Sequence, residues 1–127
     1  MGQEAIHPTN LPGPLGPYVP AVLENYTHRL WFSGMSGRSP TTNKLVEGLE
    51  AQTEQALNNI ETVLLKVRWD LKNVLFCRIY LIDMADYEKV NGIYRAKFQS
   101  PFPARSILGV TSLPGRALIE IECVAGS

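Results

Sequence analysis

The fold is decided at residues 73–82, which read NVLFCRIYLI. Apolar side chains occupy both faces of this stretch, as they do in a strand at the centre of a sheet. Amphipathic helices are expected on both sides of it along the chain, because apolar residues there step by four and three. The inner stripe of the first helix consists of Leu49, Thr53, Ala56, Ile60, Val63 and Val67. The stripe of the second consists of Tyr87, Asn91, Tyr94 and Phe98, broadened by Val90 and Ile93.

Short strands are predicted at both ends of the chain. Residues 8–20 hold five prolines and two glycines and form an extended arm that leads into a first strand, followed by a second at residues 29–34. Strands at 104–112 and 117–125 follow the second helix, joined by the type II turn signal LPGR at 113–116. This order predicts an α+β fold, a mixed sheet with both helices on one face. The uncovered face would carry large apolar residues, which favours oligomerisation.

The chain has 127 residues and is expected to be a single domain, residues 1–127, with an extended N-terminal arm at 1–14. Twelve basic and twelve acidic residues cancel, which argues against a protein whose main task is to grip nucleic-acid phosphates. Cys77 and Cys123 lie in apolar runs and are expected to be buried thiols in a reducing compartment. No signal peptide or membrane span is recognised, so we expect a cytoplasmic protein.

Arg105 is the most unusual residue, because no acidic residue occurs within ten positions before it or fourteen after it. A hairpin at 113–116 predicts that Gly109 faces Glu120, Ile107 faces Glu122, and Arg105 faces Val124. Arg105, Glu120 and Glu122 would then share the sheet face away from the helices. Two interpretations stay open. Arg105 forms a structural ion pair with Glu122, or it is a bidentate carboxylate receptor with Glu120 as a base that orients water.

Other candidate site residues carry a weaker sequence signal than Arg105 and Glu120. Asn91 lies on the apolar stripe of the second helix, Ser33 and Gly34 end a strand, and Tyr18 follows the arm. His7 and His28 have no neighbours at metal-ligand spacing, and no nucleotide-binding loop is present. The residues therefore indicate neither a metal nor an organic cofactor.

Six fragments together resemble the YjgF/RidA family, in the family's order and over residues 15–125. They are GPY (16–18), FSG (32–34), TEQALNNIETVL (53–64), YLIDMADYEKVNGIY (80–94), FPARS (102–106) and LPGRALIEIE (113–122). The resemblance implies a chorismate-mutase-like α+β fold. It also implies a homotrimer whose sheets line a central barrel, with a cleft between each pair of subunits. Members of the RidA branch hydrolyse reactive 2-imino and 2-enamino acids, such as 2-iminopropanoate and 2-iminobutanoate, to 2-oxo acids and ammonia without a cofactor.

By the same resemblance Arg105 clamps the substrate carboxylate and Glu120 positions water. Tyr18, Ser33, Gly34 and Asn91 match the remaining cleft positions. Ile107 stands where several deaminases have cysteine, so that only its backbone would serve. The loop at 35–44 also departs from the family's sequence.

We expect each site to be completed by residues of two subunits. Two alternatives remain: a non-catalytic trimer that binds 2-oxo or amino acids as a regulator, and an endoribonuclease or translation inhibitor. Nucleic acid is not an expected partner of a chain with no net charge, and a membrane is not an expected partner because no apolar run approaches a membrane span.

Overall fold

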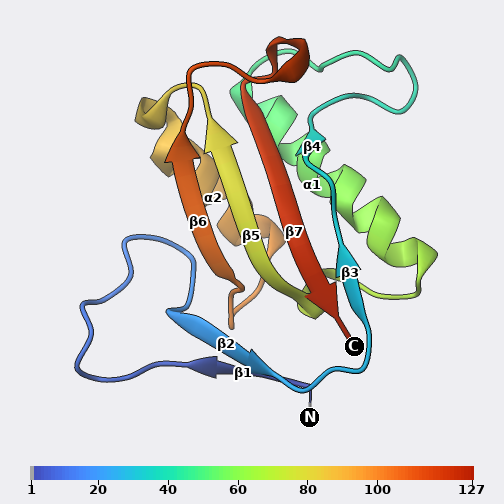
Figure 1. Cartoon of the computed structure of the whole chain (residues 1–127). Coiled ribbons are helices and arrows are strands. Elements are labelled where there is room, and N and C mark those ends of the chain that lie inside the picture. The colour runs from blue at the N-terminus through green and yellow to red at the C-terminus, as the bar shows by residue number, and fades with distance from the viewer. Residues whose placement is uncertain (1) are drawn as a thin grey trace.

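The computed structural model describes residues 2–127 as a five-stranded mixed sheet with two helices packed on one face (Figure 1). The central strand is β5 (Val74–Leu81), which pairs in parallel with β6 (Ala104–Gly109) and antiparallel with β7 (Ile119–Gly126). The far edge of β7 pairs with two short strands, β3 (Arg29–Trp31) and β4 (Met35–Ser36). Helices α1 (Leu49–Lys66) and α2 (Tyr87–Lys97) lie behind the sheet in Figure 1. The predicted α+β fold is therefore confirmed.

The core lies between the helices and the sheet. Alternate residues of β5, namely Cys77, Ile79 and Leu81, are fully buried against it. The predicted stripe of α1 is confirmed from Leu49 to Ile60, but Val63 is only half-buried and Val67 is 43% exposed. The structure buries Leu57 and Leu64 in their place. The reason is that a 3.6-residue period drifts from a strict four–three alternation, and Val67 already lies beyond the end of the helix.

The predicted pairing of the last two strands is wrong, because β5 lies between β6 and β7. The turn itself has the expected conformation: Gly115 has φ of 67°, and the Arg116 N–H donates to the Leu113 carbonyl at 3.2 Å. A second turn follows, in which the Ala117 N–H donates to the Pro114 carbonyl at 3.3 Å, and residues 114–116 carry the chain across the end of β5 instead of closing a hairpin. A strand that is apolar on both faces is most stable with partners on both edges, and this crossing supplies them.

The N-terminal region forms a separate two-stranded antiparallel hairpin. Its strands are β1 (Gln3–Ile6), which the sequence did not predict, and β2 (Ala21–Glu24). The proline-rich loop between them returns along the free edge of β6, where Val19 forms a parallel bridge with Ala104. This contact places the loop beside Arg105, the next residue of β6.

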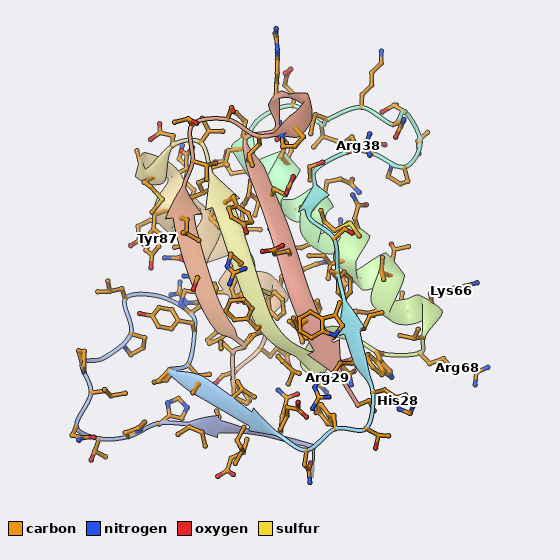
Figure 2. All side chains as sticks on the ribbon, viewed as in Figure 1. His28, Arg29, Arg38, Lys66, Arg68 and Tyr87 are labelled. Atoms are coloured by element: carbon orange, nitrogen blue, oxygen red, sulfur yellow. The ribbon has the colours of Figure 1, made fainter. Side chains whose placement is uncertain are left out.

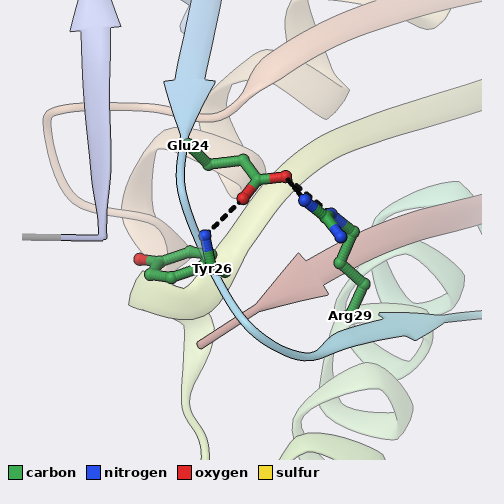
Figure 3. Close-up of polar contacts among 3 residues, drawn as sticks. All are labelled: Glu24, Tyr26 and Arg29. Carbon is green, nitrogen blue, oxygen red and sulfur yellow. Dashed lines mark hydrogen bonds and ion pairs between the residues drawn. The ribbon is translucent and has the colours of Figure 1, made fainter.

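A polar clasp joins this hairpin to the main sheet (Figure 3). The Glu24 carboxylate accepts hydrogen bonds from the Tyr26 backbone N–H and from Arg29 Nε, both at 2.6 Å. The Tyr26 hydroxyl donates to Gln3 Oε1 at 2.8 Å, and its ring packs against Gly126 at the end of β7. The clasp therefore connects both strands of the hairpin to the main sheet.

The face of the sheet away from the helices is uncovered, as predicted. It carries an ion pair between Arg78 and Glu122 at 2.9 Å, which the Tyr80 hydroxyl joins at 2.6 Å. Apolar side chains at the edges of the sheet are also exposed to solvent, and Trp31 of β3 is 73% exposed. Short 3-10 helices occupy Leu71–Asn73 and Met84–Asp86. Within residues 2–127 no helix has the length and apolar character needed to cross a lipid bilayer.

The clasp should open in acid. The Tyr26 N–H, and then Arg29, hold the pKa of Glu24 below its ordinary value of 4.5. A lowered folded-state pKa contributes stability that is complete above 4.5 and is lost as the pH falls through the folded value. We expect the NMR shift of the Tyr26 amide to titrate with a midpoint below 4.5, and the Glu24→Gln variant to lack that transition. A midpoint at or above 4.5 would contradict the clasp.

Candidate active site

Arg105 lies on β6 with its side chain on the helix side of the sheet. It pairs across the ladder with Cys77, whose side chain is in the core, and it is only 9% exposed. Three tyrosine rings surround its guanidinium carbon, with centroids at 4.9 Å for Tyr94, 5.7 Å for Tyr18 and 5.9 Å for Tyr87. Ring faces attract a cation, so this cage holds the charge without neutralising it.

The guanidinium has no polar partner in the described chain. Both of its terminal nitrogens are buried without a hydrogen bond, as are Asn91 Oδ1 and the Tyr94 hydroxyl. The predicted alternative of an Arg105–Glu122 ion pair is wrong, because Glu122 pairs with Arg78 on the other face. Parallel N–H groups of a guanidinium fit a carboxylate in bidentate fashion. The site can therefore bind a small carboxylate, and Asn91 Oδ1 is a further buried acceptor without a partner.

The arm loop lies over this cluster. The Leu15 N–H donates to the Tyr18 hydroxyl at 3.1 Å, and the Tyr18 N–H donates to the Gly16 carbonyl at 2.9 Å. A Cβ at Gly16 would lie 2.8 Å from an Arg105 terminal nitrogen and 3.1 Å from both Asn91 Nδ2 and the Tyr87 hydroxyl. Glycine at this position thus lets the loop backbone approach the guanidinium closely.

A pocket of about 600 Å³ opens next to the guanidinium. It is lined by Leu15, Tyr18, Met84, Tyr87, Arg105 and Ile107. Figure 2 shows Tyr87 at the free edge of β6, on the side of the molecule opposite His28 and Arg29. Three predicted site residues, Tyr18, Arg105 and Ile107, therefore share one pocket, and Asn91 adjoins it.

The remaining predicted residues gather on the other face of the sheet. Glu120 of β7 lies opposite Ser36 of β4 and Tyr80 of β5, and it is half-buried. Gly34 directly precedes β4 and packs against the Glu120 carboxylate so closely that a Cβ would collide with it. Ser33 is exposed beside them. The Glu120 carboxylate and the Ser33 hydroxyl are therefore available to a ligand or a second subunit that binds to the open face.

The prediction that Arg105 and Glu120 share one face is wrong. Their partners on β5 are Cys77 and Tyr80, three positions apart, and an odd number of positions places side chains on opposite faces. The two residues are also offset by roughly 10 Å along the strand direction. Because the sheet lies between them, one chain cannot bring both to the same small ligand.

Two thiols lie in the core on the strands next to Arg105, since Cys77 pairs with Arg105 and Cys123 pairs with Cys77. Cys77 and Cys123 are buried and free, as predicted, with their Sγ atoms 3.3 Å apart. The hydrogen bond with Cys77, together with burial, raises the pKa of Cys123, and burial raises the pKa of Tyr94. The Cys123 thiol and the Tyr94 hydroxyl therefore stay protonated and uncharged at neutral pH. No group of three metal-ligating side chains occurs among residues 2–127.

Sequence reasoning missed the roles of Gly16, Tyr87 and Tyr94 in the site. Both tyrosines were assigned to the inner stripe of α2, where an aromatic residue usually packs in the core. The signal that distinguishes them is that this stripe carries three polar groups, two hydroxyls and the Asn91 amide, on one buried face.

The chain is similar to proteins with names that bear on this chemistry. The model of the family described as Endoribonuclease L-PSP matches residues 8–127. Reactive Intermediate Deaminase A, chloroplastic, of Arabidopsis thaliana is 41% identical over 124 residues, which are 97% of this chain and 65% of that protein. The 2-iminobutanoate/2-iminopropanoate deaminase of Homo sapiens is 38% identical over 124 residues, 97% of this chain and 89% of that protein.

A solved structure extends the likeness to three dimensions. RidA from an Antarctic Psychrobacter species matches with a TM-score of 0.77 at 30% identity, covering 98% of this chain and 99% of that chain. This chain spans just under two thirds of the length of the Arabidopsis relative.

The close approach of Gly16 can be tested with 2-oxobutanoate as a stable carboxylate probe. We expect Gly16→Ala to weaken its binding at least tenfold by calorimetry. The added methyl displaces a guanidinium whose charged hydrogen bonds are worth about 1.5–3 kcal/mol. Gly13→Ala is the matched control in the same loop, because a Cβ there meets nothing within 4 Å. Equal affinities for the two variants would show that the loop does not hold the guanidinium.

Proposed function

Since this chain belongs to the YjgF/RidA family, the family described as Endoribonuclease L-PSP, we propose that it is a hydrolytic deaminase of 2-imino and 2-enamino acids. Its products are 2-oxo acids and ammonia, and 2-iminopropanoate and 2-iminobutanoate are members of its substrate class. The observation that carries the proposal is the buried guanidinium of Arg105, which has no acidic partner in the described chain. Every substrate of this class has a carboxylate next to the reacting carbon.

Arg105 binds the substrate carboxylate through both terminal nitrogens, while Tyr18 and Tyr87 close the pocket around it. Asn91 Oδ1, which is buried and free to accept, takes a hydrogen bond from the substrate iminium N–H. These two contacts fix the C=N carbon in one position, which lowers the entropy cost of the attack by water. Neither contact requires a metal or an organic cofactor.

The hydrolysis has two steps. Water adds to C2 as its proton passes to the Glu120 carboxylate, and the C=N π-electrons move to nitrogen to form a carbinolamine. Glu120 then returns the proton to nitrogen and the C–N bond breaks to release ammonia, while Glu120 takes the proton of the C2 hydroxyl as its oxygen becomes the ketone oxygen. An iminium is already electrophilic, so the main requirement is a base positioned next to the attacking water.

We place Arg105 and Glu120 of one site on two different subunits. Three copies would assemble through their uncovered sheet faces into a homotrimer with three clefts. Arg105, Tyr18, Asn91 and Ile107 would come from one subunit, and Glu120, Ser33 and Gly34 from its neighbour. Support comes from their opposite faces within one chain and from the exposed Trp31 and Leu108 on the uncovered side.

Ile107 supplies no thiol, so the proposed route forms no covalent enzyme intermediate. Its side chain lines the pocket on the same side of β6 as Arg105. Two buried free thiols suit a reducing compartment, and we propose the cytoplasm as the site of action.

The first test is a coupled assay in which an amino-acid oxidase generates the imine and semicarbazide traps what survives. We expect the protein to suppress semicarbazone formation. Arg105→Ala should reduce its specific activity about thirtyfold or more, because removing one partner of a charged pair costs about 2–5 kcal/mol. Arg95→Ala is the matched control, since Arg95 is an exposed arginine of α2 outside the pocket.

Binding of 2-oxo acids without suppression of trapping would contradict catalysis and leave a regulator that uses the same guanidinium. If the protein neither suppresses trapping nor binds 2-oxo acids, but binds RNA in a salt-sensitive manner, the ribonuclease alternative is favoured.

The second test asks whether a site draws on two subunits. Arg105→Ala and Glu120→Gln chains, each nearly inactive alone, are unfolded together in equal amounts and refolded as mixed trimers. If Arg105 and Glu120 of one site come from neighbouring subunits, random mixing regenerates about a quarter of the intact sites. If both come from one subunit, no mixed trimer has an intact site, and unrestored activity would overturn the shared site. Refolded wild-type protein sets the scale.

A further inference from the structure

We infer that this site selects 2-imino acids with apolar side chains that reach at least the γ-carbon, through an apolar subsite formed by Leu15, Met84 and Ile107. The inference rests on the proposed function and adds to it the substrate class. It follows from how the pocket continues beyond Arg105, in the direction that a substrate side chain must take.

The subsite runs along one side of β6. Arg105, Ile107 and Gly109 follow at every second position of the strand and therefore share the helix side of the sheet. Met84 lies over Gly109, where a Cβ would be 2.9 Å from Met84 Cγ. The order along the groove is thus the guanidinium, then Ile107, then Met84, with Leu15 of the arm loop as a further wall.

The walls of this groove suit an apolar group. Of the six residues that line the pocket, Arg105 alone is charged. In the proposed complex its guanidinium binds the substrate carboxylate. Leu15 is 81% exposed and Met84 is 43% exposed, so both have apolar surface that a ligand can cover. A polar or charged side chain placed between Ile107 and Met84 would lose water without gaining a hydrogen-bond partner from them.

The spacing sets the length of the preferred side chain. Gly109, which Met84 covers, lies two positions beyond Ile107, so the apolar wall continues for roughly 6.6 Å along the strand past Ile107. The methyl group of 2-iminopropanoate is a single carbon and covers only the start of this wall. The branched side chain of a leucine-derived imine adds γ- and δ-carbons that extend along the wall toward Met84.

The test compares imines generated from leucine, alanine and aspartate in the semicarbazide assay. Its readout is the protein concentration that halves trapping of each imine. We expect the leucine-derived imine to need at least tenfold less protein than the alanine-derived one, since each methylene in an apolar pocket changes selectivity about tenfold or more. The aspartate-derived imine should be the poorest substrate.

Two variants assign this preference to the groove. Ile107→Ala and Met84→Ala should each reduce the leucine-to-alanine ratio at least threefold, and Met84→Ala alters a side chain that is 43% exposed, so its folding is little affected. Leu65→Ala, which truncates an exposed leucine on α1, is the matched control and should keep the ratio. A ratio near one, or a ratio unchanged in both groove variants, overturns the subsite and leaves the deaminase proposal in place.

A binding measurement separates the two proposals. Calorimetry with 4-methyl-2-oxopentanoate and pyruvate, the products of the leucine- and alanine-derived imines, needs no turnover. At least tenfold tighter binding of the larger acid supports the subsite even if no imine is hydrolysed, in which case the proposed function alone fails. Equal binding of the two acids overturns the subsite.

Discussion

A cation without an acidic partner, buried at the edge of the core, is the feature on which the candidate site depends. Removing a guanidinium from water is costly unless hydrogen bonds and an opposite charge compensate it. Around Arg105 three tyrosine rings compensate part of that cost, and within residues 2–127 both terminal nitrogens stay without a hydrogen bond. A bound carboxylate supplies both missing interactions at once. The fold therefore positions an unpaired guanidinium for a carboxylate before any ligand binds.

The alternation of side chains along β5 then decides what one chain can do alone. Arg105 and Glu120 pair with β5 at positions of opposite parity, so the sheet separates the clamp from the carboxylate. The same sheet leaves one face uncovered, with Trp31 and Leu108 exposed on it. Association with further copies of the chain would cover the open face. It would also bring the Arg105 group of one copy to the Glu120 group of another. A trimer is thus proposed for chemical as well as hydrophobic reasons.

The sequence predicted those features that local periodicity controls. The two helices, the buried strand β5, the buried thiols and the burial of Asn91 all follow from spacing along a single segment. The order of the strands does not, because the turn at 113–116 has the same local conformation whether it closes a hairpin or crosses β5. That one ambiguity moved Arg105 to the wrong face and suggested Glu122 as its partner.

Contacts between segments that are distant in the sequence also could not be predicted from local patterns. Gly16 meets Arg105 and Asn91 through a loop whose path is set by the Val19–Ala104 bridge, and the sequence gives no sign of that bridge. The residues that the family resemblance named do gather, but in two groups on opposite faces. Motif matching named the members of the candidate site and implied clefts between subunits, whereas the predicted hairpin placed both groups on one face of the sheet.

The clamp and the apolar subsite differ in how they depend on the fold. Arg105 lies on a strand next to the core, and its cage includes Tyr94, which is fully buried. Leu15 lies on the arm loop and Met84 at the start of a single 3-10 turn, and both are substantially exposed. Substitutions of exposed side chains usually change the free energy of unfolding by less than about 0.5 kcal/mol. The wall that selects the substrate side chain can therefore vary among related chains at little cost in stability, whereas the carboxylate clamp cannot.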